Sequence, residues 1–241
     1  MRYSVIKNTF FLLLLAALPG AADCRAGNPH AGEFYVSGDR EKAQFALTFD
    51  DGPGFITEDL LKLLGKHGVR ATFFMLGSSA RKHPARARLV AEAGHLVASH
   101  TDSHLNWFAT GRSTDKVKIL SGELEKAAVS IEKAAGVRPW MLRMPNGYDR
   151  PWVRRAASKR GYTLVNWTYG GDWLKATEEK ITARYLAALK PGAILLLHDG
   201  GGKAKKKNLR IVKKLLFEAG KRGLKPVRVD ELLGLPVPAK Q

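Results

Sequence analysis

Short apolar runs alternate with amphipathic helical patterns along most of this 241-residue chain. Seven runs have the length and continuous hydrophobicity of buried strands, and they lie at about 43–49, 71–76, 95–98, 140–144, 162–167, 193–197 and 225–229. Helical patterns occupy the intervals between most of these runs. Because parallel strands are joined by long crossovers that are usually helices, this alternation predicts a parallel α/β architecture.

Local signals predict where several helices begin and end. Thr57 is expected to cap the first helix, with Glu58 and Asp59 placed well against the helix dipole. Ser113 or Thr114 would cap a long helix that ends at Gly136. A basic amphipathic helix is expected at about 206–221.

Chemically useful side chains follow the predicted strands at the point where each strand ends. They are Asp50-Asp51, the segment from His100 to His104, Arg143, Asp172 and His198. The carboxyl ends of parallel strands share one edge of a sheet or barrel, and α/β enzymes place their sites there. The sequence therefore predicts one site built from these residues.

The adjacent carboxylates of Asp50 and Asp51 need a specific explanation. Two like charges this close repel each other unless a cation lies between them. The segment Leu47–Pro53 is also compatible with an ordinary loop that contains an Asx-turn at a strand end. His100 and His104, four residues apart, can project to one side as two metal ligands must, although paired surface or core histidines are the simpler alternative.

Two imidazoles and one carboxylate bind a divalent ion and leave positions open for water and substrate. If Asp51 is the carboxylate ligand, Asp50 can act as the base on a metal-activated water and His198 as a general acid. His198 is otherwise a satisfied histidine at a strand end. Arg143 and Asp172 have opposite charges on neighbouring strand ends, which suggests a pair that orients Asp50, or else a surface ion pair of ~0–1 kcal/mol.

With these residues in this order, the sequence resembles the polysaccharide deacetylases, also called the NodB-homology domain or carbohydrate esterase family four. The resemblance spans about residues 43–234 and rests on five motifs in the family's order. They are Thr-Phe-Asp-Asp-Gly-Pro at 48–53, His-Thr-x-x-His at 100–104, Arg-Met-Pro-Asn-Gly at 143–147, Asp-Trp at 172–173 and Leu-Leu-His-Asp at 196–199. It implies a distorted (β/α) barrel of about seven parallel strands.

The resemblance also implies a role for each matching residue. Asp50 would be the base and His198 the acid, with Arg143 and Asp172 as the supporting pair around them. Asp51, His100 and His104 would bind the metal. The implied metal is zinc, with cobalt, nickel and manganese compatible with the same ligands.

The substrate would meet a further group of residues in this resemblance. Pro145 and Asn146 belong to the third motif, and the backbone N–H of Asn146 would hold the oxyanion. Trp173 and Leu196 would line the pocket for the acetyl methyl group. The chain departs from the family twice, because Asn146 replaces an aromatic residue and Gly170-Gly171 stand where an earlier acid is usual.

The implied reaction is hydrolysis of the N-acetyl group of N-acetylglucosamine-type residues in a cell-envelope or extracellular polysaccharide, with release of acetate. Two alternatives remain open. One is a catalytically inactive envelope protein that binds glycans, and the other is a metal-dependent hydrolase of another acyl bond, such as an O-acetyl ester. A phosphoesterase is disfavoured because a second carboxylate cluster for two metals is missing from the sequence.

The N-terminus predicts export. Residues 1–22 combine a basic start with a short apolar run and small residues, which is typical of a signal peptide; an uncleaved anchor is the alternative. Cys24 is the single cysteine, so the chain forms no internal disulfide. Asp23 before it disfavours a lipoprotein site. Residues 23–40 are expected to be a linker, 41–234 the catalytic domain and 235–241 a tail.

The formal charge of +18 is concentrated near the C-terminus. Residues 203–228 hold eleven Lys or Arg against Glu218 as the single acid, and such a surface attracts polyanions. For an exported protein of the periplasm or cell envelope, the expected partners are an anionic envelope polymer or a membrane surface rather than nucleic acid. A generally basic, solvated surface is the plainer interpretation.

Overall fold

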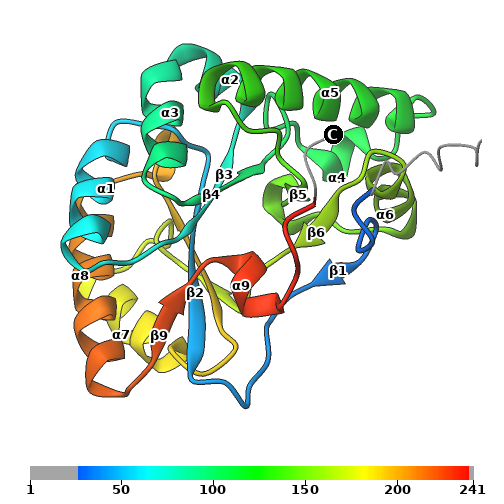
Figure 1. Cartoon of the computed structure of the whole chain (residues 1–241). Helices are drawn as coiled ribbons and strands as arrows, with labels where there is room; N and C mark the ends of the chain where they lie inside the picture. Colours follow the sequence, from blue (N-terminus) through cyan, green and yellow to red (C-terminus); the bar gives the residue numbers. More distant parts are fainter. Residues whose placement is uncertain (1–26, 239–241) are drawn as a thin grey trace, which may run out of the picture.

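A computed structural model describes residues 27–238, and in this part of the chain nine strands form one curled parallel sheet (Figure 1). The strands are β1 (Phe34–Tyr35), β2 (Gln44–Asp50), β3 (Thr72–Met75), β4 (Leu96–Ser99), β5 (Met141–Leu142), β6 (Thr163–Val165), β7 (Tyr169–Gly170), β8 (Ile194–His198) and β9 (Lys225–Val227). Their order is β1-β6-β5-β4-β3-β2-β8-β7, and β9 pairs with β2. The predicted distorted (β/α) barrel is confirmed.

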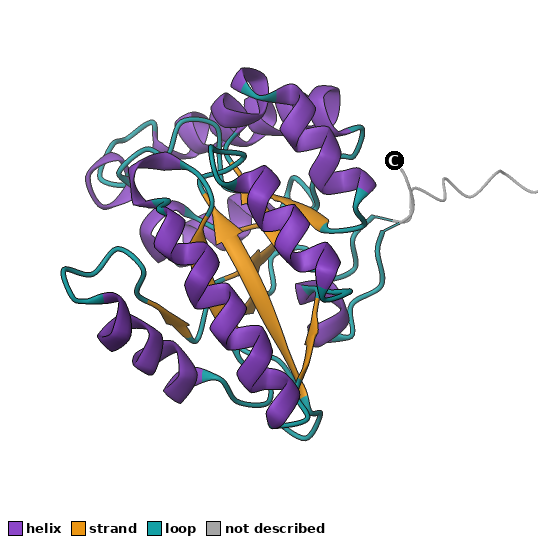
Figure 2. Ribbon diagram, turned by 90° about the vertical axis from the view of Figure 1, so that its left-hand side faces the viewer, coloured by secondary structure: helices purple, strands orange, loops and turns teal. Residues whose placement is uncertain are grey.

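Helices cover the convex side of this sheet, as Figure 2 shows from the left-hand side of Figure 1. The α-helices are α1 (Thr57–Lys66), α2 (Gly77–Lys82), α3 (Pro84–Glu92), α4 (Trp107–Thr110), α5 (Lys116–Ala135), α6 (Pro151–Ser158), α7 (Glu178–Ala188), α8 (Lys206–Lys221) and α9 (Val229–Leu233). Two short 3₁₀ segments are η1 (Pro145–Gly147) and η2 (Gly201–Lys203). Helices α1, α3, α5, α7 and α8 share one apolar core with the sheet.

The central strand β2 shows how the sequence separates core from site. Successive side chains of a strand point to opposite faces. Phe45, Leu47 and Phe49 pack into the core beneath the helices. The opposite face of β2, which lines the inside of the curled sheet, carries Ala46, Thr48 and Asp50. Ala46 belongs to the apolar core there, whereas Thr48 and Asp50 are polar. The inner face of β2 is therefore apolar at its start and polar at its carboxyl end.

The strand count exceeds the prediction because two edge strands have only two residues each. β1 pairs with β6 through Phe34 and Tyr35, and β7 pairs with β8. Such short strands leave no readable hydrophobic period. The expectation of a linker over 23–40 is thus wrong for its described part. Asn28 also ties this segment to β6, since its side-chain amide donates to the Gly161 carbonyl (2.9 Å) and to Thr163 Oγ1 (2.8 Å).

The predicted end of the long helix is confirmed, but neither predicted N-cap is. Gly136 ends α5 in the left-handed conformation, at φ 75°, as expected of a helix C-cap. The N-cap position of α5 is held by Asp115, without a side-chain cap hydrogen bond, and not by Ser113 or Thr114.

Thr57 does not cap α1, because it is already the first helical residue and its hydroxyl makes no cap hydrogen bond. Its Oγ1 instead donates to Asp199 (2.6 Å) and accepts from the Gly54 amide (2.7 Å). A tertiary contact has taken the hydroxyl that the cap needed.

The predicted signal peptide (1–22) and Cys24 lie outside the described residues. Between residues 27 and 238, none of the helices has the length and apolar character needed to cross a membrane. Of the predicted tail, Leu235 is buried in the inner core against α9. Its amide donates to the Asp230 carbonyl (2.9 Å).

Candidate active site

The carboxyl edge of the sheet brings the predicted acid, base and metal-ligand residues together. Asp50 and His198 end the neighbouring strands β2 and β8 and lie directly opposite each other in register. His100 follows β4, Arg143 follows β5 and Asp172 follows β7. All five of these side chains are buried. The shared edge predicted from parallel strands is therefore observed, and these side chains are almost fully shielded from solvent.

Asp51, His100 and His104 form the one group of three in the described chain whose His, Asp, Glu or Cys ligand atoms lie close enough to hold a metal ion. Asp51 Oδ1 is 3.5 Å from His100 Nε2 and 3.5 Å from His104 Nε2. Both Asp51 (φ 68°) and His104 (φ 57°) have a left-handed backbone, which non-glycine residues adopt rarely and often at functional sites. The chain thus holds these two ligands in place through strained turns.

Two observations show that this cluster fits a metal ion. Asp51 Oδ1 is buried and has no hydrogen-bond partner, a costly arrangement unless something else satisfies it. His100 Nδ1 lies 2.7 Å from the Arg143 carbonyl oxygen, so it carries the ring proton and leaves the Nε2 lone pair facing Asp51. Burial lowers the pKa of His100 to about 3, which keeps the ring neutral as a ligand must be.

Asp50 is held beside this cluster by Arg143. The Arg143 Nη1 donates to Asp50 Oδ1 (2.8 Å) and to Thr48 Oγ1 (2.8 Å), while its other nitrogens donate to the carbonyls of Val165 and Asn166. The guanidinium also lies over the Phe74 ring, 4.0 Å from its centroid. Asp50 Oδ1 is engaged in this way, and Oδ2 lies 3.8 Å from His100 Nε2, on the side of the metal cluster.

His198 stands on the other side of the cluster, oriented by Asp172. Its Nδ1 is 2.9 Å from Asp172 Oδ1, and its backbone amide donates to Asp172 Oδ2 (2.8 Å). The Nε2 atom lies 3.9 Å from Asp51 Oδ2. Burial opposes the charged ring, but the hydrogen bond and the charge of Asp172 outweigh it and raise the pKa of His198. A protonated Nε2 facing the cluster is the arrangement of a general acid.

Arg143 and Asp172 therefore do not form the pair that their strand-end positions suggested. Arg143 makes its ion pair with Asp50 and Asp172 makes its own with His198; in residues 27–238 the two do not meet. Each charge supports a different reactive group. The prediction that Arg143 orients Asp50 agrees with this geometry, whereas the expected Arg143–Asp172 contact is wrong.

Two residues that sequence reasoning missed complete the support of Asp172. Asn208 on α8 donates its amide to Asp172 Oδ2 (2.7 Å) and to the His198 carbonyl (2.9 Å). Tyr185 on α7 accepts from the amides of Gly171 and Asp172 (2.9 and 3.1 Å) and donates to the Leu196 carbonyl. Asn208 falls on the buried stripe of α8, and a polar residue on an apolar stripe is the signal that could have revealed it.

Asp199 packs against the loop that follows β2 and binds Thr57 at its end. This buried carboxylate accepts from Thr57 through Oδ2, whereas its Oδ1 has no partner. Burial, with the charges of Asp50 and Asp51 nearby, raises the pKa of Asp199 to about 7. Gly52 leaves room for the carboxylate, because a Cβ there would lie 2.3 Å from both of its oxygens.

The predicted substrate residues lie around the mouth of the site. Trp173 is 41% exposed, and its ring meets His198 edge-on with the centroids 5.3 Å apart. Leu196 is buried beside it, and both flank Gly170, where a Cβ would lie 2.9 Å from the Trp173 ring and 3.1 Å from Leu196. The glycine at this departure from the family motif thus leaves space for the tryptophan.

In the third motif, Pro145 is buried and Asn146 is exposed. Asn146 has a left-handed backbone within η1, at φ 57°. Lys203 of η2 also reaches the mouth, with Nζ 3.8 Å from Asp51 Oδ2 and 6.0 Å from the Trp173 ring centroid.

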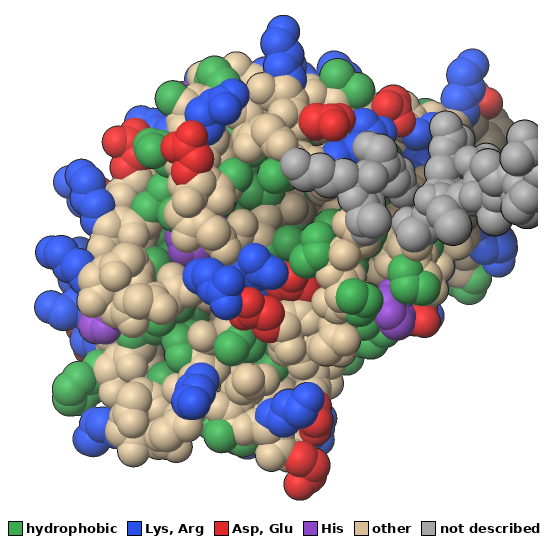
Figure 3. Space-filling model, viewed as in Figure 1, with side chains coloured by type: hydrophobic (Ala, Val, Ile, Leu, Met, Phe, Trp, Pro, Cys, Tyr) green, Lys and Arg blue, Asp and Glu red, His purple; other side chains and the backbone are tan. Residues whose placement is uncertain are grey.

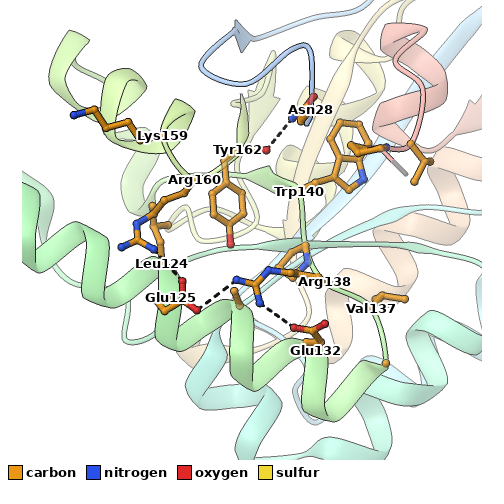
Figure 4. A pocket seen from close by; sticks show the side chains of 16 residues that line it. Asn28, Leu124, Glu125, Glu132, Val137, Arg138, Trp140, Lys159, Arg160 and Tyr162 are labelled. Atoms are coloured by element: carbon orange, nitrogen blue, oxygen red, sulfur yellow. Dashed lines mark hydrogen bonds and ion pairs between the residues drawn. The ribbon is translucent and has the colours of Figure 1, made fainter. Parts of the chain in front are cut away.

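A cavity of about 550 Å³ lies away from this site, where β5 and β6 begin (Figure 4). Trp140, Tyr162, Arg138 and Arg160 line it, and Glu125 binds both arginines. None of the predicted acid, base, ligand or substrate residues belongs to it. The cavity therefore takes no part in the chemistry considered above.

The curled parallel sheet and its carboxyl-edge cluster define a hydrolase of the (β/α)-barrel class with a His-His-Asp group that can bind metal. Residues 37–165 match the family model described as polysaccharide deacetylase. The chain belongs to the polysaccharide deacetylase family.

Two relatives and one solved structure illustrate this family. The chain is 34% identical to a peptidoglycan-N-acetylglucosamine deacetylase of Bacillus cereus, over 78% of this chain and 87% of that one. It is 36% identical to a chitooligosaccharide deacetylase of a Bradyrhizobium species, over 64% of this chain and 69% of that one. A crystal structure of a peptidoglycan N-acetylglucosamine deacetylase superposes with a TM-score of 0.76 at 28% identity, covering 84% of this chain and 94% of that one.

Proposed function

We propose that this protein is a metal-dependent deacetylase that removes the N-acetyl group from N-acetylglucosamine-type residues of a cell-envelope or extracellular polysaccharide. The observation that carries the proposal is the placement of two separately supported groups beside one ligand cluster. Asp50 is held by Arg143, His198 is held by Asp172, and the orphaned oxygen of Asp51 lies nearby. Amide hydrolysis needs a base for water and an acid for the leaving nitrogen, and this site supplies both.

The three ligands suit one divalent ion, and zinc is the proposed metal because two imidazoles and a carboxylate form a common catalytic zinc set. Cobalt, nickel or manganese fit the same donors. When bound, the ion would polarise the acetyl carbonyl and the attacking water. Asp51, His100 and His104 would hold it, and the Nδ1–H contact of His100 to the Arg143 carbonyl would keep that ring oriented.

The residues of the chain would then divide the proton transfers. Asp50, with Oδ1 bound to Arg143, takes the proton of the attacking water through Oδ2. The backbone N–H of Asn146 donates to the oxygen that becomes negative, a contribution worth ~3–4 kcal/mol per donor in comparable sites. His198 Nε2 delivers its proton to the departing nitrogen, so that acetate and a free amino sugar leave. Trp173 and Leu196 would enclose the acetyl methyl group.

Acetate release by the purified chain tests this proposal. The substrates are N-acetylglucosamine oligomers and peptidoglycan, assayed with chelator and then with zinc or cobalt restored. Release that chelator abolishes and metal restores supports the deacetylase. A chain that binds metal but releases no acetate would instead be the glycan-binding alternative, and preferential release from O-acetylated xylan would indicate the esterase alternative.

The proposal extends to location and partners. Residues 1–22 support export to the periplasm or the cell envelope, where N-acetylated polysaccharide is found. The cationic segment 203–228 supports contact with an anionic surface there, either an envelope polymer or a membrane. Fractionation of the producing cells tests the location, and a cytoplasmic protein with an intact N-terminus would contradict it.

A further inference from the structure

One side of helix α8 carries a row of cations around an exposed aromatic ring. Its members repeat every three or four residues, so they share one side of the helix. We call this row the α8 stripe, and it consists of Lys206, Arg210, Lys213, Lys214, Phe217 and Lys221, all exposed. In Figure 3, Lys and Arg side chains gather along the left-hand edge of the molecule, the side where α1 and α8 lie in Figure 1.

The charge of the α8 stripe is largely uncompensated. Arg210 binds Glu178 (2.6 Å), and Glu218 beside the stripe binds Arg222 (2.8 Å). The four lysines of the stripe make no ion pair within residues 27–238. Their ammonium groups therefore face solvent with no carboxylate within 4.0 Å, and the stripe retains a strong positive potential.

The centre of the α8 stripe is apolar. Phe217 is 68% exposed. It lines a shallow hollow together with Leu186, with three cationic residues of the stripe (Arg210, Lys213 and Lys214) and with Glu218, whose carboxylate binds Arg222. Lys221 Nζ lies 5.6 Å from the Phe217 ring centroid. A large apolar ring within a cationic rim is the composition of surfaces that lie at a lipid–water interface, because the ring leaves water while the cations meet headgroup phosphates.

We infer that the α8 stripe docks this protein on an anionic phospholipid surface. Of the two anionic partners considered for the segment 203–228, an envelope polymer and a membrane, this inference selects the membrane. Phosphate or carboxylate groups of a polymer would satisfy the lysines but would offer Phe217 and Leu186 no apolar phase. Lipid headgroups satisfy the lysines, and the acyl boundary beneath them accepts the ring.

Only the first residue of the α8 stripe lies near the polar edge of the sheet, because α8 runs from that edge toward the start of β9, which pairs with the start of β2. Lys203, whose ammonium is 3.8 Å from Asp51, precedes the first residue of α8 by three positions. The docking itself concerns binding alone, so it stands or falls independently of the proposed deacetylation.

Vesicle co-sedimentation tests the inference with the full chain as its producing cells process it. The vesicles contain phosphatidylglycerol and phosphatidylcholine, or phosphatidylcholine alone as the baseline common to all variants. We expect tighter binding to the anionic vesicles, and weaker binding in 0.5 M salt. Each lysine near such a surface contributes about 1 kcal/mol, so Lys213→Gln with Lys214→Gln is expected to weaken the anionic component about 30-fold.

Two further variants make the test specific. Phe217→Ser should weaken vesicle binding without changing the charge. Lys118→Gln with Lys133→Gln removes two exposed lysines of α5, which packs against α2 and α3, and should leave binding unchanged. Equal losses in the α5 and α8 variants would overturn the inference in favour of general charge attraction. Binding to inorganic polyphosphate but not to vesicles, insensitive to Phe217→Ser, would overturn it in favour of a polymer.

Discussion

Arg143 Nη1 lies 2.8 Å from Asp50 Oδ1, and both side chains are buried. Removing either member of a buried pair leaves a charge without its partner, at a cost of about 3–5 kcal/mol. An arginine in the interior of a small barrel is thus tolerated because Asp50, Thr48 and two carbonyl oxygens satisfy it. The pair gives the carboxylate of Asp50, the proposed base, a structural role as well.

The first prediction separates these two functions of Asp50. Asp50→Asn keeps an oxygen that can accept from Arg143 but cannot take a proton from water. We expect the variant to fold and to bind metal, at reduced stability because the charge of Arg143 is no longer balanced, while kcat falls about 10²- to 10⁴-fold, the usual contribution of a general base. Metal analysis and acetate kinetics measure the two effects. Asp50→Ala is the matched variant and should unfold at still lower denaturant, because it leaves Arg143 unpaired; turnover near that of the natural protein in Asp50→Asn would refute the base assignment.

The second prediction concerns the pH dependence of His198. Asp172 raises the pKa of His198, and a general acid must be protonated to act. Asp172→Asn removes that charge, so the pKa should fall and the alkaline limb of the kcat profile should move to lower pH. The profile of kcat from pH 5 to 9 measures this. An unchanged alkaline limb, with only a uniform loss of rate, would mean that His198 is not the acid.

The third prediction concerns Asn208, which donates to both Asp172 and the His198 carbonyl. Asn208→Ala removes both hydrogen bonds and should lower kcat about tenfold or more, because misplaced catalytic groups are costly. In an Asp172→Asn background the same change should cost much less, since residues of one network are not additive. Steady-state kinetics of the four proteins give the coupling, and fully additive losses would argue that Asn208 acts elsewhere.

The fourth prediction concerns stability rather than activity. His95 is buried, and its Nδ1 accepts from the Ala71 amide (3.0 Å). Burial lowers the pKa of His95 to about 4, below the value near 6.5 of an unfolded chain. Protonation of His95 therefore favours the unfolded state. The contribution of neutral His95 to the free energy of unfolding is fully present above about pH 6.5 and is lost as the pH falls toward 4.

For His95 alone this decline amounts to about 2 kcal/mol between pH 7.5 and pH 5. His95→Asn keeps an acceptor for the Ala71 amide but does not titrate, so its free energy of unfolding should fall less over the same interval. Urea unfolding at the two pH values measures the difference, and the other histidines cancel in the comparison. Equal declines in the two proteins would show that His95 does not govern acid stability.

Most of the site could be predicted because its residues stand at the ends of recognisable strands. Asp50-Asp51, the pair His100 and His104, and His198 were all placed at one edge by the alternation of strands and helices. That inference needs only two local facts, the hydrophobic period of each run and the short reach from a strand end to the shared edge. Both facts depend only on residues that are neighbours in the sequence. The same holds for the helix end at Gly136 and for the basic pattern of α8.

Which of these side chains bind each other could be seen only in the tertiary structure. Arg143 binds Asp50 rather than Asp172, Thr57 binds Asp199 rather than capping α1, and Asn208 crosses from α8 to the strand ends. The strands β1 and β7, with two residues each, also exist only through their neighbours β6 and β8. For the longer strands and helices, local sequence determines which elements form and which edge carries the polar residues. Contacts between residues distant in the chain depend on how the sheet curls, since several polar groups compete for each donor and only packing decides which one lies within reach.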